Sequence, residues 1–531
     1  MDILCQLCII IVLNIYIGYI RYKVKTKYVK YAYFTTKLGD ILTKTYAEIN
    51  EKIKNGEAVV VTAEEMVDIV AQKGVKVAAE EIDIVTTGTF GPMCSSGAFL
   101  NFGHSDPPIK FEHLWLNDVH AYHGNAAVDC YIGCTRLSEV KRFEYGGGHV
   151  IEDLVAGKPI RLRGNSYTTD CYPLAEVNTE FTINEINQAI LVNPRNAYQR
   201  YVCAVNSSDR TLYTYMGKLL PRFGNAHYAG AGCLSPLSND PDYETIGIGT
   251  RIFLGGGTGY VIGEGTQHSP SNQFGTLFVK GDLKQMSAEY LRGVSYEEYG
   301  TSLFVGLGIP IPILNEGLAK KTAISDAELF TDIIDYGIPR RDRPKLRRVN
   351  YEELRGEYIE LNGKKVKCSS LSSLYHARKI AETLKKWIQK GKFYLNPPAE
   401  TLPTDTVVKP MKQTSKVKFV KDLKREAIIC SDDCDLKTVA EKIIDQNLNH
   451  IVVTDSENKL KGIVTSFDVT KAIARDKTDL NDIITKKVIT TTDNEPIDVA
   501  IRKMKLNNIS ALPVINDLNK VTGIITSEEL I

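Results

Sequence analysis

The sequence predicts an α/β protein in which a mixed α+β region, of unassigned topology, is followed by a tandem α/β module. Short β-branched runs beside helix start signals indicate the first part: Val59 to Val61 precedes Thr62 to Glu65, a pattern typical of a capped helix. Between residues 90 and 270 the composition shifts to Gly, Asn, Ser, Thr and Tyr around further short strands. Near the C-terminus a helix, strand, turn, strand unit occurs twice, which indicates two similar units that cover each other's sheets.

Composition is that of an ordinary globular protein. The 531 residues are 43% hydrophobic and 24% charged, and a chain of this length predicts about three units. Because 65 basic residues stand against 64 acidic ones, overall charge does not indicate a nucleic acid or an anionic surface as a partner. Eleven cysteines at irregular spacing are typical of reduced thiols rather than of disulfides or zinc fingers. We therefore expect a cytoplasmic protein that binds no nucleic acid.

Residues 1–40 differ from the rest of the chain. Ile3 to Ile20 is an apolar run, and five basic residues follow between Arg21 and Lys30. A run of this length is near the lower limit for crossing a bilayer, and the basic flank would hold the remainder in the cytoplasm. An extension from an upstream start codon explains the same residues equally well. Membrane anchor and spurious extension therefore both stay open, and the globular sequence begins near Lys44.

The next elements follow from periodicity. Tyr46, Ile49 and Ile53 recur at helical spacing, the helix that starts at Thr62 runs through Ala71, and residues 82–87 form a strand. Residues 248–254 predict another strand. Three glycines follow it without the Lys-Ser/Thr ending of a phosphate-binding loop, so we expect a plain tight turn.

Helical, charged sequence then leads to a linker. Residues 323–334 and 371–389 show amphipathic periodicity and predict two helices. Residues 397–422 contain several prolines, including Pro403 and Pro410, and predict a linker to the C-terminal module.

Three cysteines lie among small residues in loop-like sequence, which predicts exposed thiols. They are Cys94, Cys171 in the polar stretch of residues 164–173, and Cys233. For Cys130 and Cys134, by contrast, packing inside the protein is favoured over a metal site, since free cysteine is among the most buried residue types.

Histidines and arginines supply candidates for proton transfer and for anion binding. His104, His120 and His123 titrate near neutrality and are candidate proton donors. The three-residue spacing of His120 and His123, without a matching carboxylate or cysteine pair, does not by itself predict a metal site. An arginine would suit a substrate carboxylate by bidentate geometry. The sequence does not choose among four in this half of the chain: Arg136, Arg161, Arg163 and Arg222.

The segments around Cys94, from Asn101 to Pro108 and around Cys171 together resemble the archaeal homocysteine biosynthesis family, found typically in methanogens. The resemblance runs from about Lys44 and implies a catalytic domain at residues 44–396. It implies an L-aspartate semialdehyde sulfurtransferase that makes L-homocysteine, with a persulfide on Cys171 and with sulfide as a substrate. We assign Cys94 as a second functional thiol and His104 as a catalytic histidine. Electrons would come from a ferredoxin-domain reductase partner, and we expect no metal or tightly bound cofactor.

The C-terminal repeat resembles a pair of CBS domains, at residues 423–478 and 479–531. The stretch that ends at Asp468 returns sixty-one residues later and ends at Glu529. In that family the Thr and Asp of this stretch hold the ribose and phosphate of adenosyl ligands, which implies a regulatory site at Thr465 and Asp468 and, in the second copy, at Thr526. Because Glu529 replaces the usual Asp, we expect one competent site, for S-adenosylmethionine or methylthioadenosine. We also expect a homodimer formed through this pair.

Two other functions stay open on the sequence alone. One is a lyase or hydrolase that uses Cys94 as nucleophile with one of the histidines. The other is a non-enzymatic, adenosyl-responsive regulatory protein whose first part only binds a partner.

Overall fold

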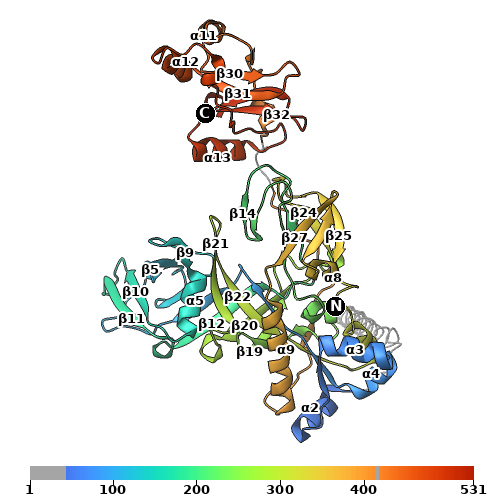
Figure 1. Cartoon of the computed structure of the whole chain (residues 1–531). Coiled ribbons are helices and arrows are strands. Elements are labelled where there is room, and N and C mark those ends of the chain that lie inside the picture. The colour runs from blue at the N-terminus through green and yellow to red at the C-terminus, as the bar shows by residue number, and fades with distance from the viewer. Residues whose placement is uncertain (1–43, 413–417, 531) are drawn as a thin grey trace, which may run out of the picture. The chain divides into compact units, whose positions relative to one another are not determined.

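The computed structural model describes residues 44–412 and 418–530, and the predicted anchor or extension at residues 1–40 lies outside them. The chain divides into two compact units. The first comprises the described residues up to 408, apart from the loop 338–343, and the second contains the described residues from 409 onward. Each unit mixes helices with strands (Figure 1), which confirms the predicted α/β class.

The first unit opens with helices around a three-stranded sheet. The hydroxyls of Thr45 and Thr62 each accept a hydrogen bond from the backbone N–H of the glutamate three residues on, and the carboxylate of that glutamate accepts one from the threonine backbone N–H. Both helices therefore begin with a capping box, as predicted at Thr62. The sheet order is β1-β2-β23. The elements are α2 (Tyr46–Asn55), β1 (Val60–Thr62), α3 (Ala63–Lys73), α4 (Val75–Glu81), β2 (Ile84–Thr86), β23 (Pro310–Pro312) and α7 (Glu316–Lys321).

A nine-stranded antiparallel sheet forms the centre of this unit. Its hairpin between β18 and β19 turns at Gly255 and Gly256, which have φ of 61° and 95°, so the predicted tight turn is confirmed. The sheet order is β21 (Leu291–Tyr296), β22 (Gly300–Gly308), β18 (Arg251–Leu254), β19 (Gly257–Glu264), β20 (Leu277–Asp282), β12 (Gln188–Asn196), β4 (Gly97–Asn101) and β7 (Asp129–Gly133), with β3 (Thr89–Pro92) paired to β22.

A second, six-stranded antiparallel sheet shares its core with the first. Leu100 and Ile132 of the large sheet, Leu116 of the smaller sheet and Val150 of α5 (Gly147–Val155) belong to one buried cluster. The start of α5 lies against backbone: a Cβ on Gly148 would come within 2.2 Å of the Ser302 carbonyl oxygen. The strand order is β11 (Glu176–Phe181), β10 (Ile160–Asn165), β5 (His113–Leu116), β6 (Val119–Ala121), β8 (Leu137–Ser138) and β9 (Arg142–Gly146).

A third sheet is mixed and corrects one prediction. The helix expected at residues 323–334 is absent from the described structure. Residues 330–335 form β24 instead, because their Thr and Ile side chains are buried on both faces of a sheet. The predicted helix near residues 371–389 is confirmed as α9 (Leu374–Gln389). The sheet order is β25 (Lys345–Asn350), β24 (Phe330–Asp335), β13 (Cys203–Val205), β16 (Ala226–Tyr228), β27 (Lys364–Ser370) and β26 (Tyr358–Leu361).

Short elements complete the first unit, and they include part of the stretch that composition assigns to the linker. Leu402 is buried, and His268 lies 2.9 Å by its Nε2 from the Pro403 carbonyl oxygen, so residues 397–408 pack on this unit. The short elements are β14 (Leu212–Thr214), β15 (Gly217–Leu219), α6 (Pro236–Asn239), β17 (Gly247–Ile248), α8 (Tyr351–Arg355) and β28 (Glu400–Thr401), with 3₁₀ turns at Ile183–Glu185, Gly232–Leu234, Pro270–Asn272 and Leu283–Gln285.

The second unit contains the predicted repeat. Val452 and Ile524, one from each copy, share a buried cluster. Val420 lies before the first copy and packs in the core of the second. The elements are α10 (Val420–Leu423), β29 (Ile429–Ser431), α11 (Leu436–Asp445), β30 (His450–Thr454), β31 (Leu460–Thr465), α12 (Ser466–Ile473), α13 (Ile497–Asn507), β32 (Ala511–Ile515) and β33 (Val521–Thr526), with 3₁₀ turns at Leu480–Asp482 and Ser527–Leu530.

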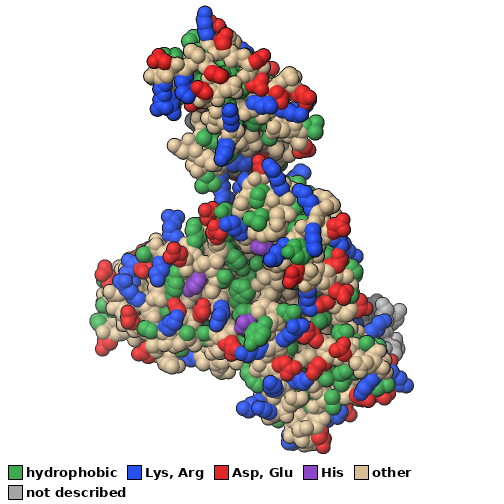
Figure 2. Space-filling model, in the orientation of Figure 1, with side chains coloured by type: hydrophobic (Ala, Val, Ile, Leu, Met, Phe, Trp, Pro, Cys, Tyr) green, Lys and Arg blue, Asp and Glu red, His purple; other side chains and the backbone are tan. Residues whose placement is uncertain are grey.

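The surface of both units carries charges of both signs. Figure 2 shows Lys and Arg interspersed with Asp and Glu over the visible face, as the near-zero net charge implies. In residues 44–412 and 418–530, none of the helices combines the length and the apolar character that a bilayer crossing requires.

Candidate active site

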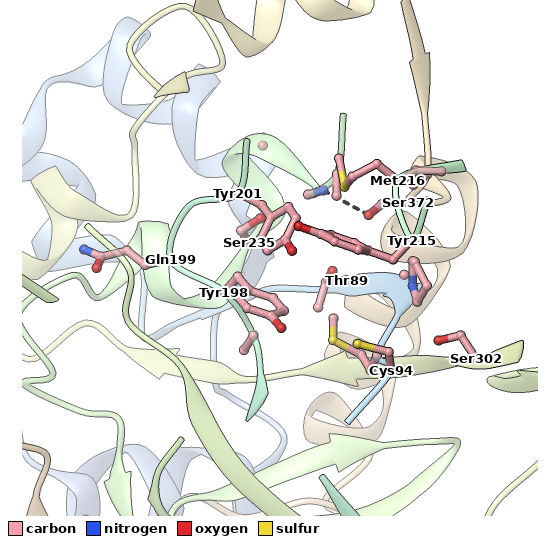
Figure 3. A pocket seen from close by; sticks show the side chains of 18 of the residues that line it. Thr89, Cys94, Tyr198, Gln199, Tyr201, Tyr215, Met216, Ser235, Ser302 and Ser372 are labelled. Carbon is pink, nitrogen blue, oxygen red and sulfur yellow. Dashed lines mark hydrogen bonds between the residues drawn. The ribbon is translucent and has the colours of Figure 1, made fainter. Parts of the chain in front are cut away.

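An enclosed cavity in the first unit is lined mainly by tyrosines and by small residues. The loop between β3 and β4 brings Cys94 to it, and β21 and the loop after it bring Tyr296 and Tyr299. Tyr198 and Tyr215 come from other segments of the chain. Figure 3 shows the side chain of Cys94 at one side of this space, with the rings of Tyr198 and Tyr215 across from it. The cavity measures about 70 Å³, whereas one water needs about 10–15 Å³ by the same measure. It therefore suits a molecule of a few heavy atoms.

Cys94 has an exposed thiol, and its backbone carbonyl accepts a hydrogen bond from a buried cysteine. The buried Cys134 donates a hydrogen bond from its Sγ to the Cys94 carbonyl oxygen, at 3.3 Å. Burial among the tyrosines raises the pKa of Cys94, and the nearby positive charge of Arg195 opposes that rise. A nearby positive charge favours the thiolate form of a cysteine, which is the nucleophile.

Arg195 lies close enough to Cys94 to affect its pKa, although it is not among the residues that line the cavity, and sequence reasoning missed it. Its backbone N–H donates to Asn193 Oδ1 at 2.8 Å, and its Nε donates to Thr266 Oγ1 at 3.1 Å, so its backbone and its guanidinium group are each held by one hydrogen bond. Ser95, next to Cys94, donates to the same Asn193 oxygen at 2.9 Å. Asn193 therefore connects the loop that carries Cys94 to β12, the strand that carries Arg195. The four arginines considered from sequence do not line the cavity: Arg136, Arg161, Arg163 and Arg222.

The tyrosines around the cavity stay protonated at neutral pH. Burial is the main cause that raises the pKa values of Tyr198, Tyr201 and Tyr296. The hydroxyl of Tyr215 lies 2.7 Å from that of Tyr336. Neutral phenol groups can donate hydrogen bonds to a carbonyl oxygen or to a developing oxyanion.

Cys171 lies on a different surface, at the tip of a tight turn. Thr169 and Tyr172 exchange backbone hydrogen bonds of 3.0 Å in both directions, so Asp170 and Cys171 form the two central positions. The thiol of Cys171 is exposed, and its Sγ lies 3.5 Å from Thr169 Oγ1. Asp170 is exposed as well. Lys110 is near the turn: its pKa is raised first by Tyr167 and, more weakly, by Cys171.

His104 accompanies Cys171 rather than Cys94. Its ring stacks on that of Tyr172, the residue after Cys171, with centroids 5.9 Å apart. Neither His104 nor Cys171 is among the residues that line the Cys94 cavity. The three residues assigned as catalytic from sequence thus fall into two places, one enclosed and one exposed.

The remaining cysteines are less accessible. Of the nine cysteines among the described residues, only Cys94 and Cys171 are exposed. Cys233 is buried, and burial raises its pKa, so the exposed thiol expected there is not found. Cys130 and Cys134 are buried, as predicted, and burial raises both of their pKa values strongly. A thiol that must meet other molecules is therefore Cys94 or Cys171.

The second unit holds a larger open cleft, of about 810 Å³. Thr465 and His450 of the first copy and Ser510 and Ser527 of the second line it. Thr465 caps α12, and its hydroxyl donates to Asp468 at 2.6 Å. Thr526 makes the matching contact to Glu529 at 2.7 Å but is buried and is not among the lining residues. Both copies therefore build the same cap, while only the first presents its threonine to the cleft.

An exposed thiol that lines a small cavity and a second exposed thiol on a surface turn are features of a thiol-dependent enzyme. A family model described as homocysteine biosynthesis enzyme, sulfur-incorporation, matches residues 58–395, and the CBS domain model matches residues 420–475 and 480–531. Since the first match covers more than half of the chain, the protein belongs to the homocysteine biosynthesis enzyme family, and it carries a CBS pair. The resemblance seen in the sequence is confirmed.

Two curated relatives agree with this assignment, and one similar solved structure covers the C-terminal part of the chain. The chain is 53% identical to an L-aspartate semialdehyde sulfurtransferase of Methanosarcina acetivorans, over 92% of this chain and 98% of the relative. It is 52% identical to the enzyme of the same name from Methanocaldococcus jannaschii, over the same shares. A crystal structure of a CBS domain pair in complex with 5′-methylthioadenosine and S-adenosyl-L-methionine is 37% identical, covers 22% of this chain and 94% of its own, and gives a TM-score of 0.21.

Proposed function

We propose that this enzyme is an L-aspartate semialdehyde sulfurtransferase that produces L-homocysteine. The observation that carries the proposal is the placement of the two exposed cysteines, one inside a small cavity and one on a surface turn, in a chain that matches two sulfurtransferases along almost their whole length. A reaction that takes sulfur from a donor and adds it to a small aldehyde needs both an accessible thiol and an enclosed one.

The Cys94 cavity would bind the aldehyde. Arg195, which lies near Cys94 without lining the cavity, would hold the α-carboxylate by a charge-assisted hydrogen bond. The protonated hydroxyl of Tyr198 would donate to the aldehyde oxygen, where negative charge develops when sulfur attacks the carbon. Apolar and aromatic walls exclude water from this step.

Cys171 would carry the sulfur to the cavity. A sulfane sulfur donor forms a persulfide on Cys171, and the Cys94 thiolate then attacks the outer sulfur, which leaves Cys171 as a thiolate and Cys94 as the persulfide. Because the turn at Thr169–Tyr172 is exposed, the donor reaches Cys171 without entering the cavity. His104, which stacks on Tyr172, is placed to exchange protons with this turn.

The chemistry on the aldehyde needs an external reductant. The terminal persulfide sulfur forms a C–S bond with the aldehyde carbon, two electrons break the S–S bond, and water leaves to give a thioaldehyde. Two more electrons and two protons reduce the thioaldehyde to the thiol. From persulfide and aldehyde to cysteine, homocysteine and water, four electrons and four protons are consumed. A ferredoxin-domain reductase partner would supply these electrons, in keeping with a cytoplasmic site of action and with free thiols.

The CBS pair would regulate the enzyme by binding an adenosyl compound. The cleft at Thr465 has room for a nucleoside, since its volume is about ten times that of the Cys94 cavity. S-adenosylmethionine and methylthioadenosine both derive from the product, so the concentration of either would indicate how much homocysteine the cell needs. Binding alters activity only if the two conformations of the pair differ in affinity for the ligand. We propose that the enzyme also forms a homodimer through the same pair.

Mass spectrometry of the intact protein after treatment with polysulfide tests the proposal. We expect one added sulfur on Cys171 and, at longer times, on Cys94. In Cys171→Ala the added sulfur and homocysteine formation from aspartate semialdehyde, with a chemical reductant, should both be lost. Cys434→Ala, a half-buried cysteine of the second unit, is the matched control and should behave as wild type.

Two results would instead support the alternatives. Trapping of the substrate carbon skeleton on Cys94 without any sulfur requirement would indicate a lyase or hydrolase. Unchanged activity in the double variant Cys94→Ala, Cys171→Ala would indicate that the first unit only binds a partner.

A further inference from the structure

Three histidines meet on the six-stranded sheet, outside both sites described above. His113 lies on β5, His120 on the neighbouring β6, and His123 just beyond the end of β6. One ring nitrogen of each lies within 4.8 Å of the other two. The ring centroids of His113 and His123 are 5.1 Å apart, and those of the other two pairs are 6.0 Å apart. The sequence shows only the pair at 120 and 123, and the third member becomes visible when β5 and β6 pair.

Unpartnered polar atoms lie at the same place. His123 Nδ1 is buried and has no hydrogen-bond partner. Asn165 lies directly opposite His113 in the β5–β10 register, and its Oδ1 is also buried without a partner. Side chains of directly opposed residues in an antiparallel pair point to the same face, so the orphaned amide oxygen belongs to the face that carries His113. Buried polar atoms normally find a partner, and two unpaired ones beside a histidine group point to a missing ligand.

Charged side chains of both signs lie around the histidine group. Arg136 and Glu139 are both close enough to His120 to interact with it electrostatically. The positive charge of Arg163 is directed onto the ring of Trp115, 4.4 Å from its centroid. Glu139 accepts from Trp115 Nε1 at 2.9 Å and supplies a negative charge near His120.

We propose that His113, His120 and His123 bind one divalent transition-metal ion, of which Zn²⁺ is the best match. Three neutral imidazoles are a donor set that zinc uses when its fourth position stays open. With Zn–N distances of about 2.0–2.1 Å, ligand nitrogens in a tetrahedral site lie roughly 3.4 Å apart. The three ring nitrogens, which lie within 4.8 Å of one another, would have to come closer together by side-chain rotation to reach that spacing. Within the described residues the group has no fourth His, Cys, Asp or Glu, so water takes the open position.

The site would stabilise the end of the sheet at which β10 finishes and the chain continues to the Cys171 turn. His113 is paired with Asn165, the last residue of β10, and the chain leaves that residue toward the turn at 169–172. An ion that joins β5, β6 and the segment after β6 would therefore limit the motion of the strand ends that precede the turn at 169–172. This inference does not depend on the proposed sulfur chemistry.

Metal binding by the full-length protein tests the proposal directly. The protein is stripped with a chelator, titrated with Co²⁺ or Zn²⁺, and passed through a desalting column before the metal per chain is measured. We expect one equivalent with a visible tetrahedral Co²⁺ spectrum that lacks thiolate charge-transfer bands. His120→Ala and His123→Ala should each weaken this binding by at least about 10-fold.

Two further variants separate ligation from folding. His113 is exposed, so His113→Ala removes a ligand without opening the core and should lose the same equivalent. His376→Ala, a histidine of α9 outside the group, should retain it. The proposal is overturned if the stripped wild type takes up no ion with this spectrum, or if His113→Ala binds as tightly as wild type while circular dichroism shows both to be folded.

Discussion

The Sγ of Cys134 lies 3.3 Å from the carbonyl oxygen of Cys94 and donates a hydrogen bond to it, so a buried thiol holds the backbone of the exposed one. Cys134→Ala removes this donor and leaves a small void, and we expect the free energy of unfolding to fall by about 1–2 kcal/mol. Activity should fall further than stability alone explains, because the Cys94 loop loses its support. Cys134→Ser keeps a donor and should retain more activity than Cys134→Ala. Thermal unfolding and turnover of the two variants measure the difference, and equal turnover would show that the bond does not position Cys94.

Arg195 should control the ionisation of Cys94. Burial raises the pKa of this thiol and Arg195 opposes the rise, so Arg195→Gln should raise the pKa further. At any pH below that pKa, fewer molecules then carry a thiolate. The rate of Cys94 alkylation by iodoacetamide, measured against pH in a Cys171→Ala background, should shift to higher pH.

Arg195→Lys is the matched control for that experiment. This substitution keeps the positive charge but removes the planar guanidinium group, which can bind a carboxylate through two hydrogen bonds. The alkylation profile should therefore stay near that of the protein with Arg195, while KM for the aldehyde rises. An alkylation profile in Arg195→Gln that coincides with that of the parent would exclude the electrostatic role.

Much of the fold could be predicted from local sequence. The sequence predicts the capping box at Thr62 and the glycine turn at Gly255 and Gly256, because each depends on residues within a few positions of one another. It also predicts the duplicated C-terminal unit, because the same short stretch occurs twice. The pattern of residues 323–334 predicts a helix, but residues 330–335 form a strand because they pair within the sheet with β25 and with β13, and the β13 segment lies more than 120 residues earlier in the chain.

The candidate site could be predicted only in part, for the same reason. The two exposed thiols were indicated by small, polar neighbours, but Cys233 had similar neighbours and is buried under tertiary contacts. Arg195 lies a hundred residues from Ser95 in the chain, and only the pairing of β12 with β4 brings the two segments together. The separation of His104 from the Cys94 cavity likewise has no local signal.

Gly148 should be intolerant of any side chain. A Cβ there would lie 2.2 Å from the carbonyl oxygen of Ser302, a residue that lines the Cys94 cavity. Gly148→Ala must therefore push α5 away from β22, and we expect a loss of roughly 2–4 kcal/mol in the free energy of unfolding together with lower activity. Gly263→Ala is the control, because a Cβ at that glycine meets nothing within 4 Å. Chemical denaturation of the two variants provides the comparison, and similar midpoints would show that α5 adjusts at no cost.

Thr465 and Thr526 should differ in ligand binding although they make the same local contact. Each hydroxyl donates to the carboxylate three residues on, so alanine at either position should cost about 1 kcal/mol in stability of the second unit. Only Thr465 lines the cleft, and Thr465→Ala should therefore weaken binding of methylthioadenosine or S-adenosylmethionine, whereas Thr526→Ala should leave the affinity close to that of wild type. Isothermal titration of the full-length variants with each ligand measures both affinity and stoichiometry. A stoichiometry of two, with Thr526→Ala losing one site, would mean that the second copy binds as well, despite Glu529 and its ion pair with Arg425.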